Sequence, residues 1–219
     1  MGVSRPSGPV AKAPSIGAMP DRPVLPDLPG AAEVPLPTRW LVRDATADDA
    51  AACAAIYAPY VTGTTVTFET EPPDATEVAR RIAAAQERHA YLVLEEDGVV
   101  VGYAYAGPFK ARAAYRWSCE VSVYLAGHRR GLGGGRRLYE ALLERLAARG
   151  YRTAAAGMTQ PNEASARLHA ALGFEPVGTY RAIGWKLGAW RDVTWVQRAL
   201  GDPLASPDPP DGQDPPGPA

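Results

Sequence analysis

The sequence predicts a mixed α/β fold, and two patterns in it predict this class. Two β-rich runs flank the turn Glu96-Asp97-Gly98, and such a pair of runs forms an antiparallel hairpin. A helical pattern follows further along the chain, where Leu138, Leu142 and Leu146 recur every four residues. Strand and helix patterns therefore belong to the same folding unit.

Proline is concentrated at the two ends of the chain. Nine of the 22 prolines precede Thr38 and seven follow Leu200. These ends carry too little apolar surface to offset the loss of chain entropy on folding, so residues 1–37 and 201–219 are predicted to be disordered extensions. Residues 38–200 form the predicted domain, which is long enough to bury a core without disulfides or metal. Because Met19 also precedes this domain, the N-terminal extension is either a functional arm or the result of a start codon placed too early.

The domain is expected to begin with a strand and a helix. Trp40–Arg43 is the expected strand, and Thr46 followed by Asp49 is a typical capping pair for the helix after it. Pro59 is expected to end this helix, because proline lacks the amide donor that a helix interior needs. The β-branched segment Thr62–Phe68 then suits a loop or a short strand.

A second helix, the hairpin and another strand come next. Asp74 and Glu77 are expected to cap a helix that runs to Arg88, and its many charges indicate a side that faces solvent. After the hairpin, Trp117–Leu125 alternates as a strand does and is expected beside the hairpin in the sheet. That placement gives Glu120 a defined face of the sheet.

The rest of the domain alternates between helix and strand. A glycine-rich segment leads into the leucine-patterned helix, which is expected to end at Gly150. The elements expected after it are a strand, a helix that Asn162 begins, and two last strands, at Tyr151–Thr159, Glu163–Leu172, Phe174–Tyr180 and Asp192–Ala199.

Charge and cysteine content exclude several classes of function. The formal net charge of −1 gives no electrostatic basis for binding nucleic acid or an anionic membrane. Cys53 and Cys119 fit no metal-ligand spacing, which favours reduced thiols, with a disulfide as the alternative. No apolar run has the length of a membrane span, and residues 1–37 lack the apolar core of a secretion signal. We therefore expect a cytoplasmic protein with no metal, no nucleic-acid partner and no membrane partner.

Glycines crowd the junction between the strand that ends at Leu125 and the next helix. Backbone N–H groups are unsatisfied at a helix start, and residues without a Cβ let an anion approach them, so a pyrophosphate fits there. The alternative is a flexible turn with a glycine-tolerant helix cap. No Lys-Ser/Thr pair follows for a P-loop, and the context of a dinucleotide fingerprint is missing. The candidate binding residues are Arg130, Gly131, Leu132, Gly133, Gly134, Gly135 and Arg136, with Arg129 as a further local cation.

Three segments decide between these readings of the glycines. RGLGGG at Arg130–Gly135, PNEASARLHAALGF at Pro161–Phe174 and VSVYL at Val121–Leu125 together resemble the GNAT acetyltransferases in motif, order and spacing. A closer similarity, from about Arg43 to Arg198, is to the phosphinothricin N-acetyltransferases, and GPFKARAAYRW is its most specific segment. Two positions depart from that pattern, with Phe109 in place of tryptophan and Glu69 in place of arginine.

The resemblance implies a GNAT fold, with a mostly antiparallel central sheet flanked by helices. It also implies that acetyl-CoA is the cosubstrate, that an amine is the acceptor and that the protein is a homodimer. In this fold a backbone N–H near Val123 would donate to the oxyanion, and Val123, Tyr124 and Leu125 would pair with the pantetheine arm through their main chain. Ordinary sheet packing is the alternative for these residues, and the two interpretations are compatible.

Acetyl transfer to an amine needs a group that accepts a proton, and Glu120 is the candidate base. In the middle of a strand an unpaired carboxylate is costly unless it faces a polar cleft; the alternative is a solvent-facing carboxylate on an edge strand. The resemblance supports the base, because the family has its proposed base here.

Two further residues of the resembling segments carry predicted roles. His169 lies where many members of the family have a tyrosine, and it would protonate the leaving thiolate or assist Glu120; a structural histidine is the alternative. Asn162 would bond the pantetheine arm, cap its helix, or do both.

Cations just before the strand of Glu120 suggest where an acidic acceptor binds. Lys110 and Arg112, with Tyr115 nearby, suit a carboxylate or phosphinate, although a basic surface loop is the alternative. Phe68 and Tyr124 are candidate walls of the same pocket, or simply core residues.

The sequence therefore predicts acetylation of the α-amino group of phosphinothricin, methionine sulfoximine or a related small acidic amino acid. The alternatives are a GNAT enzyme that acetylates a protein N-terminus or another amine, and a non-catalytic acyl-CoA-binding sensor.

Overall fold

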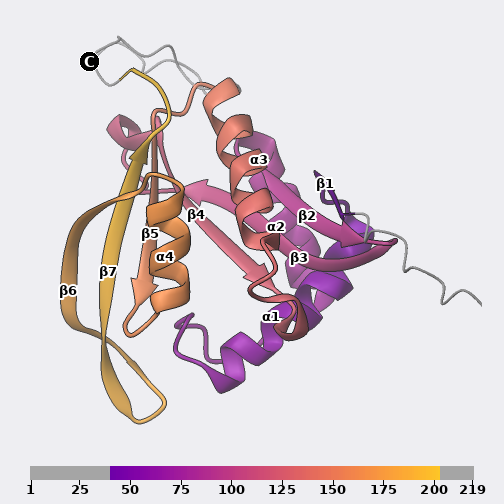
Figure 1. The fold of residues 1–219 in the computed structure, drawn as a ribbon, viewed down its shortest axis with the longest axis horizontal. Helices are drawn as coiled ribbons and strands as arrows, with labels where there is room; N and C mark the ends of the chain where they lie inside the picture. The colour runs from indigo at the N-terminus through magenta and orange to yellow at the C-terminus, as the bar shows by residue number, and fades with distance from the viewer. Residues whose placement is uncertain (1–39, 203–219) are drawn as a thin grey trace, which may run out of the picture. The chain divides into compact units, whose positions relative to one another are not determined.

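A computed structural model describes residues 40–202 (Figure 1). The expected extensions at residues 1–37 and 201–219 therefore lie almost entirely outside the described residues. No helix among the described residues is both long and apolar enough to cross a membrane.

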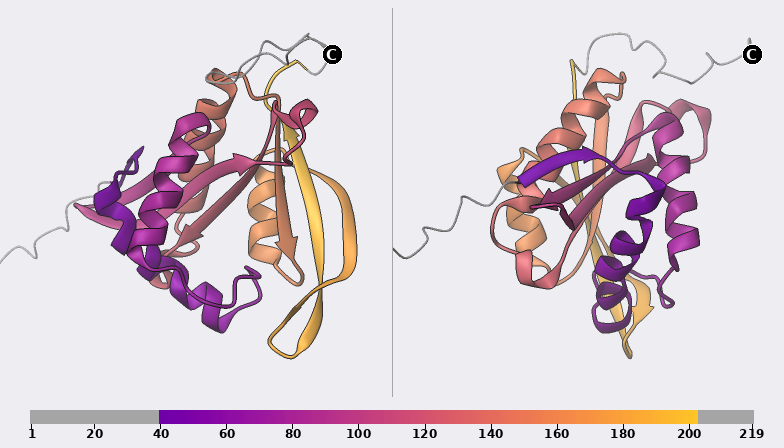
Figure 2. Two further views of the ribbon diagram at one scale, coloured as in Figure 1. Left: turned by 180° about the vertical axis from the view of Figure 1, so that it is seen from behind. Right: turned by 90° about the vertical axis from the view of Figure 1, so that its right-hand side faces the viewer.

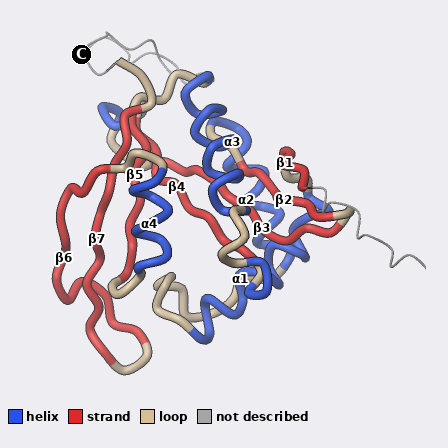
Figure 3. The backbone as a smooth tube through the Cα atoms, in the orientation of Figure 1, coloured by secondary structure: helices blue, strands red, loops and turns tan. Residues whose placement is uncertain are grey.

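Seven strands form one mixed sheet, as the sequence predicts. Its strands lie in the order β1-β2-β3-β4-β5-β7-β6 (Figure 3). Every neighbouring pair is antiparallel except β4 and β5. The strands are β1 Trp40–Asp44, β2 Tyr91–Glu96, β3 Val99–Pro108, β4 Ser118–Leu125, β5 Thr153–Thr159, β6 Glu175–Lys186 and β7 Ala189–Ala199.

Two pairs of helices lie on opposite sides of the sheet (Figure 2). α1 (Ala50–Gly63) and α2 (Ala75–Arg88) pack on one face, and α3 (Gly134–Ala148) and α4 (Glu163–Ala171) pack on the other. Short 3₁₀ turns at Ala47–Asp49, Ala113–Tyr115 and Gly127–Arg129 join the larger elements. The sheet therefore has an α1/α2 face and an α3/α4 face.

Local sequence signals explain most element boundaries. Asp97 and Gly98 both have positive φ, at 49° and 86°, which is the geometry that a two-residue hairpin turn needs. The Asp74 side chain accepts a hydrogen bond from the Glu77 amide at 2.8 Å and begins α2. Thr46 and Asp49 form the expected capping box before α1.

The expectation that Pro59 ends the first helix is wrong, because α1 continues through it to Gly63. Tyr60 and Val61, just beyond the proline, are buried in the core of the α1/α2 face. Their burial offsets the hydrogen bond that proline cannot make. The Thr64 hydroxyl donates to the Tyr60 carbonyl at 2.7 Å, which helps to satisfy the end of the helix.

The last two strands are longer than expected. β6 and β7 continue to a tight turn at Leu187 and Gly188, whose φ angles are 50° and 74°. Trp185 and Trp190 therefore lie in the hairpin and pair across it. β6 forms one edge of the sheet, and most of its residues are exposed.

The cores on the two faces differ in composition. The α3/α4 face is mainly aliphatic, and Leu138, Leu142 and Leu146 of α3 are fully buried in it. Burying each of these leucines stabilises the fold by about 1.5–3 kcal/mol. The α1/α2 face is rich in tyrosine, with Tyr57, Tyr60, Tyr91, Tyr103 and Tyr124 all buried.

Candidate active site

β4 directs Glu120 to the tyrosine-rich side of the sheet. Side chains alternate along a strand, and Tyr124 of β4 packs in the core of the α1/α2 face. Glu120 lies four residues earlier and shares that face. Its antiparallel partner on β3 is Gly107, and its parallel partner on β5 is Ala155. The carboxylate therefore lies between two neighbours with little or no side chain.

The Glu120 carboxylate is half-buried, and no hydrogen bond or ion pair holds it among residues 40–202. Burial raises the pKa of this carboxyl, and the positive charge of Lys110 partly opposes the rise. A carboxylate with a raised pKa and a free lone pair is suited to accept a proton.

A cavity of about 710 Å³ opens on the same face, between α2, the end of β3 and the segment that leads into β4. Lys110, Arg112 and Tyr115 all line it, so the structure brings together three of the predicted substrate residues. Every acidic or basic lining residue other than His89 is a cation: Arg80, Arg81, Arg88, Lys110, Arg112 and Arg116.

Gly107 connects this cavity to Glu120. It lines the cavity, and a Cβ placed on it would meet no atom within 4 Å. Cross-strand partners project from the same face about 5 Å apart, so a side chain at position 107 would lie beside the Glu120 carboxylate. The missing side chain keeps this space open.

A second cavity of about 370 Å³ is lined mainly by residues of β5, β6 and β7. Ala155, the β5 partner of Glu120, lines it together with Gly178 and Trp195. Lys110 lines both cavities, and its ammonium lies 5.1 Å from the centre of the Phe109 ring.

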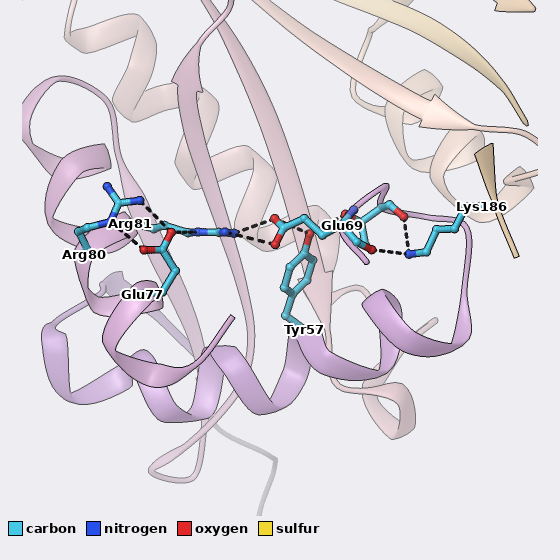
Figure 4. A network of polar contacts seen from close by, with 7 residues as sticks. Tyr57, Glu69, Glu77, Arg80, Arg81 and Lys186 are labelled. Atoms are coloured by element: carbon cyan, nitrogen blue, oxygen red, sulfur yellow. Dashed lines mark hydrogen bonds and ion pairs between the residues drawn. The ribbon is translucent and has the colours of Figure 1, made fainter. Parts of the chain in front are cut away.

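The arginines of α2 are cavity residues that sequence reasoning missed. Their helix looked like one with a solvent-facing charged side, but Arg81 reaches across to Glu69 with N–O distances of 2.7 and 3.2 Å (Figure 4). Arg81 also bonds Glu77 at 2.8 Å, and the Tyr57 hydroxyl lies 3.2 Å from Glu69. Glu69, which stands where the family pattern has arginine, is therefore neutralised by a cation of the cavity wall. A sequence pattern within α2 gives no sign of a partner on another segment.

The glycine segment leads into α3 as expected. Gly131 and Gly133 have positive φ, at 77° and 91°, and no side chain caps the start of the helix. Gly134 packs closely instead, since a Cβ at this position would lie 2.7 Å from the Leu94 side chain. The helix start thus offers uncapped amides to an anion.

β4 and β5 pair only from Ser118 to Glu120, and beyond that point the two strands diverge (Figure 1). One edge of Val121–Leu125 is left without a strand partner. The backbone groups of alternate residues point to the same edge, so Val123 directs its N–H and C=O toward β5, as Leu125 does. This arrangement fits the predicted role of the Val123 amide.

Tyr60 occupies the end of that free edge, a contact that the sequence did not reveal. Its hydroxyl donates to the Leu125 carbonyl at 2.7 Å and accepts from the Leu125 amide at 3.3 Å. The Arg130 guanidinium stacks on the Tyr60 ring at 4.5 Å and donates to the same hydroxyl at 3.1 Å. A main-chain bond from Leu125 to a pantetheine arm would have to displace Tyr60.

Asn162 and His169 make the structural contacts that were their alternative interpretations. The Asn162 side chain accepts from the Ser165 amide at 3.2 Å and caps α4, while its amide donors stay available. His169 is 3% exposed; its Nδ1 contacts the Ser165 carbonyl at 2.8 Å and its Nε2 contacts the Tyr139 hydroxyl at 3.2 Å. Burial lowers the pKa of this imidazole, which favours its neutral form. Both ring nitrogens of His169 therefore have partners, and its role in proton transfer stays a prediction.

Phe68 and Tyr124 line neither cavity. Tyr124 is buried among Tyr57, Tyr60 and Tyr103, where burial raises its pKa. Phe68 is 39% exposed and packs directly on Gly184 of β6. No group of three or more His, Cys, Asp or Glu side chains in the described part of the chain is arranged to hold a metal ion.

The profile of a family described as an acetyltransferase (GNAT) domain matches residues 42–195. The chain belongs to the GNAT acetyltransferases. Its relatives include a phosphinothricin N-acetyltransferase from Streptomyces viridochromogenes, 45% identical over 72% of this chain and 86% of the relative. An L-methionine sulfoximine/L-methionine sulfone acetyltransferase from Pseudomonas paraeruginosa is 37% identical over 75% of this chain and 96% of the relative.

Solved GNAT structures share the fold. A phosphinothricin acetyltransferase from Sinorhizobium meliloti, crystallised with acetyl-CoA, superimposes with a TM-score of 0.74 at 38% identity, over 79% of this chain and 94% of that one. This GNAT protein is therefore an N-acetyltransferase, and the mixed, mostly antiparallel sheet expected from the resemblance is confirmed.

Proposed function

We propose that this GNAT enzyme transfers an acetyl group from acetyl-CoA to the α-amino group of phosphinothricin, methionine sulfoximine or a related small acidic amino acid. The observation that carries the proposal is the position of Glu120. This carboxylate is half-buried, makes no hydrogen bond among residues 40–202, and lies opposite Gly107 beside a cavity whose charged side chains, apart from His89, are all basic.

In the proposed reaction Glu120 accepts the proton that the acceptor amine loses as it attacks the thioester carbon. The Val123 amide, on the free edge of β4, donates a hydrogen bond to the carbonyl oxygen as negative charge develops there. The acceptor attacks directly, the carbon–sulfur bond of the thioester breaks and coenzyme A leaves as its thiolate, which then takes up a proton. No covalent enzyme intermediate is required.

Acetyl-CoA would supply the acetyl thioester, and the residues present fit it. The uncapped start of α3, with Gly131 and Gly133 in left-handed conformations, suits a diphosphate. Arg130 adds positive charge there, while Arg136 forms a salt bridge with Glu140 at 2.7 Å. The side-chain amide donors of Asn162, at the start of α4, have no partner among residues 40–202. Val123 offers its main chain to the pantetheine arm.

The proposed acceptor follows from the cavity. Lys110 and Arg112 line it, and neither side chain forms a salt bridge with an acidic side chain among the described residues. An acceptor with acidic groups would be held by these cations with its amine toward Glu120. The relatives named for phosphinothricin and for methionine sulfoximine support this class.

One experiment tests this proposal. Thiol release from acetyl-CoA is measured with phosphinothricin, methionine sulfoximine, methionine sulfone and glutamate as acceptors. We expect turnover with at least one of them, and mass spectrometry should find the product acetylated on the α-nitrogen. Binding of acetyl-CoA without turnover of any amine would favour the sensor instead, and turnover only with a peptide N-terminus would favour the other enzyme class.

We also propose that the enzyme is a homodimer, as the resemblance implies. The edge hairpin exposes a row of large apolar side chains, and such a row marks an interaction surface. Its members are Val177, Tyr180, Ile183, Trp185, Leu187 and Trp190. Light scattering of the purified chain should give twice the monomer mass, and a monomer at micromolar concentration would overturn the assignment.

A further inference from the structure

Lys186, near the tip of the edge hairpin, has no part in the reaction proposed above and yet is 5% exposed. Its ammonium donates to the carbonyl oxygens of Thr67 and Glu69, at 2.7 and 2.8 Å (Figure 4). A buried lysine is costly unless its donors are satisfied. Here the ammonium bonds the carbonyl oxygens of the two residues on either side of Phe68.

Gly184 holds the same segment from the same strand. It lies two residues before Lys186 and therefore on the same face of β6. A Cβ on Gly184 would lie 2.4 to 2.7 Å from three ring atoms of Phe68, so the ring rests directly on this glycine. β6 thus fixes both the backbone around Phe68 and the side chain of Phe68.

The side chains of this segment reach the wall of the larger cavity. The Thr67 hydroxyl bonds the Tyr57 hydroxyl at 2.6 Å, and the Glu69 carboxylate holds the Arg81 guanidinium by two contacts. Tyr57 and Arg81 both line the cavity. Figure 4 shows these groups in a row from Lys186 to α2.

We propose that Lys186 is a positioning residue for acceptor binding, which acts through the Thr67–Glu69 segment to hold Arg81 in the basic wall of the cavity. This inference rests on the proposed function, since it takes the cavity to be the acceptor site. An arginine held by a carboxylate from a fixed backbone presents its remaining donors to a ligand in one orientation. Without the two hydrogen bonds from Lys186, the Thr67–Glu69 segment would move, and Arg81 would lose the orientation that Glu69 gives it.

The test compares two neutral replacements of similar length in the full chain. Lys186→Met removes all donors, whereas Lys186→Gln keeps an amide donor. We expect Met to raise the KM for the acceptor roughly fivefold and Gln roughly twofold, with the KM for acetyl-CoA unchanged. Arg167→Met, which removes an exposed cation of α4, is the control and should leave both constants unchanged.

A double-mutant cycle separates positioning from general destabilisation. In a Glu69→Ala background the link to Arg81 is already lost, so Lys186→Met should raise the acceptor KM by less than twofold. A full additional increase would overturn the inference. Should Lys186→Met fail to fold, Gly184→Ala displaces Phe68 from the same segment without removing a charge, and it too should raise only the acceptor KM.

Arg81→Met distinguishes this inference from the proposed function. If Arg81→Met leaves the acceptor KM unchanged, the cavity is not the acceptor site, and the proposed function loses its acceptor pocket. If Arg81→Met raises the acceptor KM while neither Lys186→Met nor Gly184→Ala does, the pocket stands and the role of Lys186 is refuted.

Discussion

The two faces of the sheet are built for different tasks. On the α3/α4 face, leucines pack tightly against the strands, and Gly134 lets the start of α3 approach them closely. On the α1/α2 face, tyrosines replace leucines, and a cavity lined by cations remains between helix and sheet. An aliphatic core favours one rigid arrangement, whereas tyrosines and cations leave polar groups available to a ligand. The comparison supports the proposal that the acceptor is recognised on the tyrosine-rich side.

Glu120 is the strongest test of that division, because it belongs to the tyrosine-rich face. Glu120→Gln keeps the shape of the side chain and removes the base, so turnover should fall by roughly 10² to 10⁴-fold while the affinity for acetyl-CoA stays unchanged. Steady-state kinetics and calorimetric titration measure the two quantities. Glu175→Gln, an exposed carboxylate of β6, is the matched control. Unchanged turnover in Glu120→Gln would remove this residue from the mechanism.

Gly107 tests which cavity receives the acceptor. Gly107→Val would place a branched side chain beside Glu120 and should raise the acceptor KM by roughly tenfold or more, because it fills open space between the larger cavity and the proposed base. Gly178→Val is the matched variant, since its Cβ also meets no atom within 4 Å but it lines the smaller cavity. The opposite ranking of the two variants would move the acceptor to the smaller cavity.

Lys110 and Arg112 sharpen the comparison further. Replacing either with alanine removes a cation from the cavity wall and should raise the acceptor KM roughly three- to tenfold, with kcat changed less. Arg167→Ala removes an exposed cation on the opposite side and serves as the control. If the acceptor KM rises in neither Lys110→Ala nor Arg112→Ala, the proposed basic pocket is refuted.

The smallest expected effect is on stability. Burial raises the pKa of Glu120 in the folded chain, so the folded state holds this proton more tightly than the unfolded state does. Stability therefore falls as pH rises from about 4.3, the ordinary glutamate pKa, through the raised pKa. Glu120→Gln should melt slightly higher than the natural protein at neutral pH, and the gap should close in acid. Thermal unfolding across pH 4 to 8 measures it; a lower melting temperature at neutral pH would contradict the prediction.

Features that depend on neighbours in the chain could be read from the sequence. The turn at Asp97 and Gly98, the cap at Asp74 and the leucine stripe of α3 each involve residues within a few positions of one another. Short-range patterns suffice for these because the physical cause is itself local. The position of Glu120 also followed once its strand was identified, and Lys110 and Arg112 lie in the segment just before that strand, as expected.

Contacts between distant segments could not be read in the same way. Tyr60 bonds Leu125, which is 65 positions away, and Arg81 bonds Glu69 from another element. Pro59 was expected to end its helix because the burial of Tyr60 and Val61 is visible only in the folded chain. His169 illustrates the same limit, since its contact with the Tyr139 hydroxyl depends on how α3 and α4 pack.

The sheet is joined in its middle by only three residue pairs, where β4 meets β5. This junction therefore has fewer paired residues than any other pair of neighbouring strands in the sheet. A coenzyme whose pantetheine arm lay along the open edge of β4 would bridge the junction between β4 and β5. Binding of the coenzyme would then stabilise the folded protein as well as supply the acetyl group for the reaction.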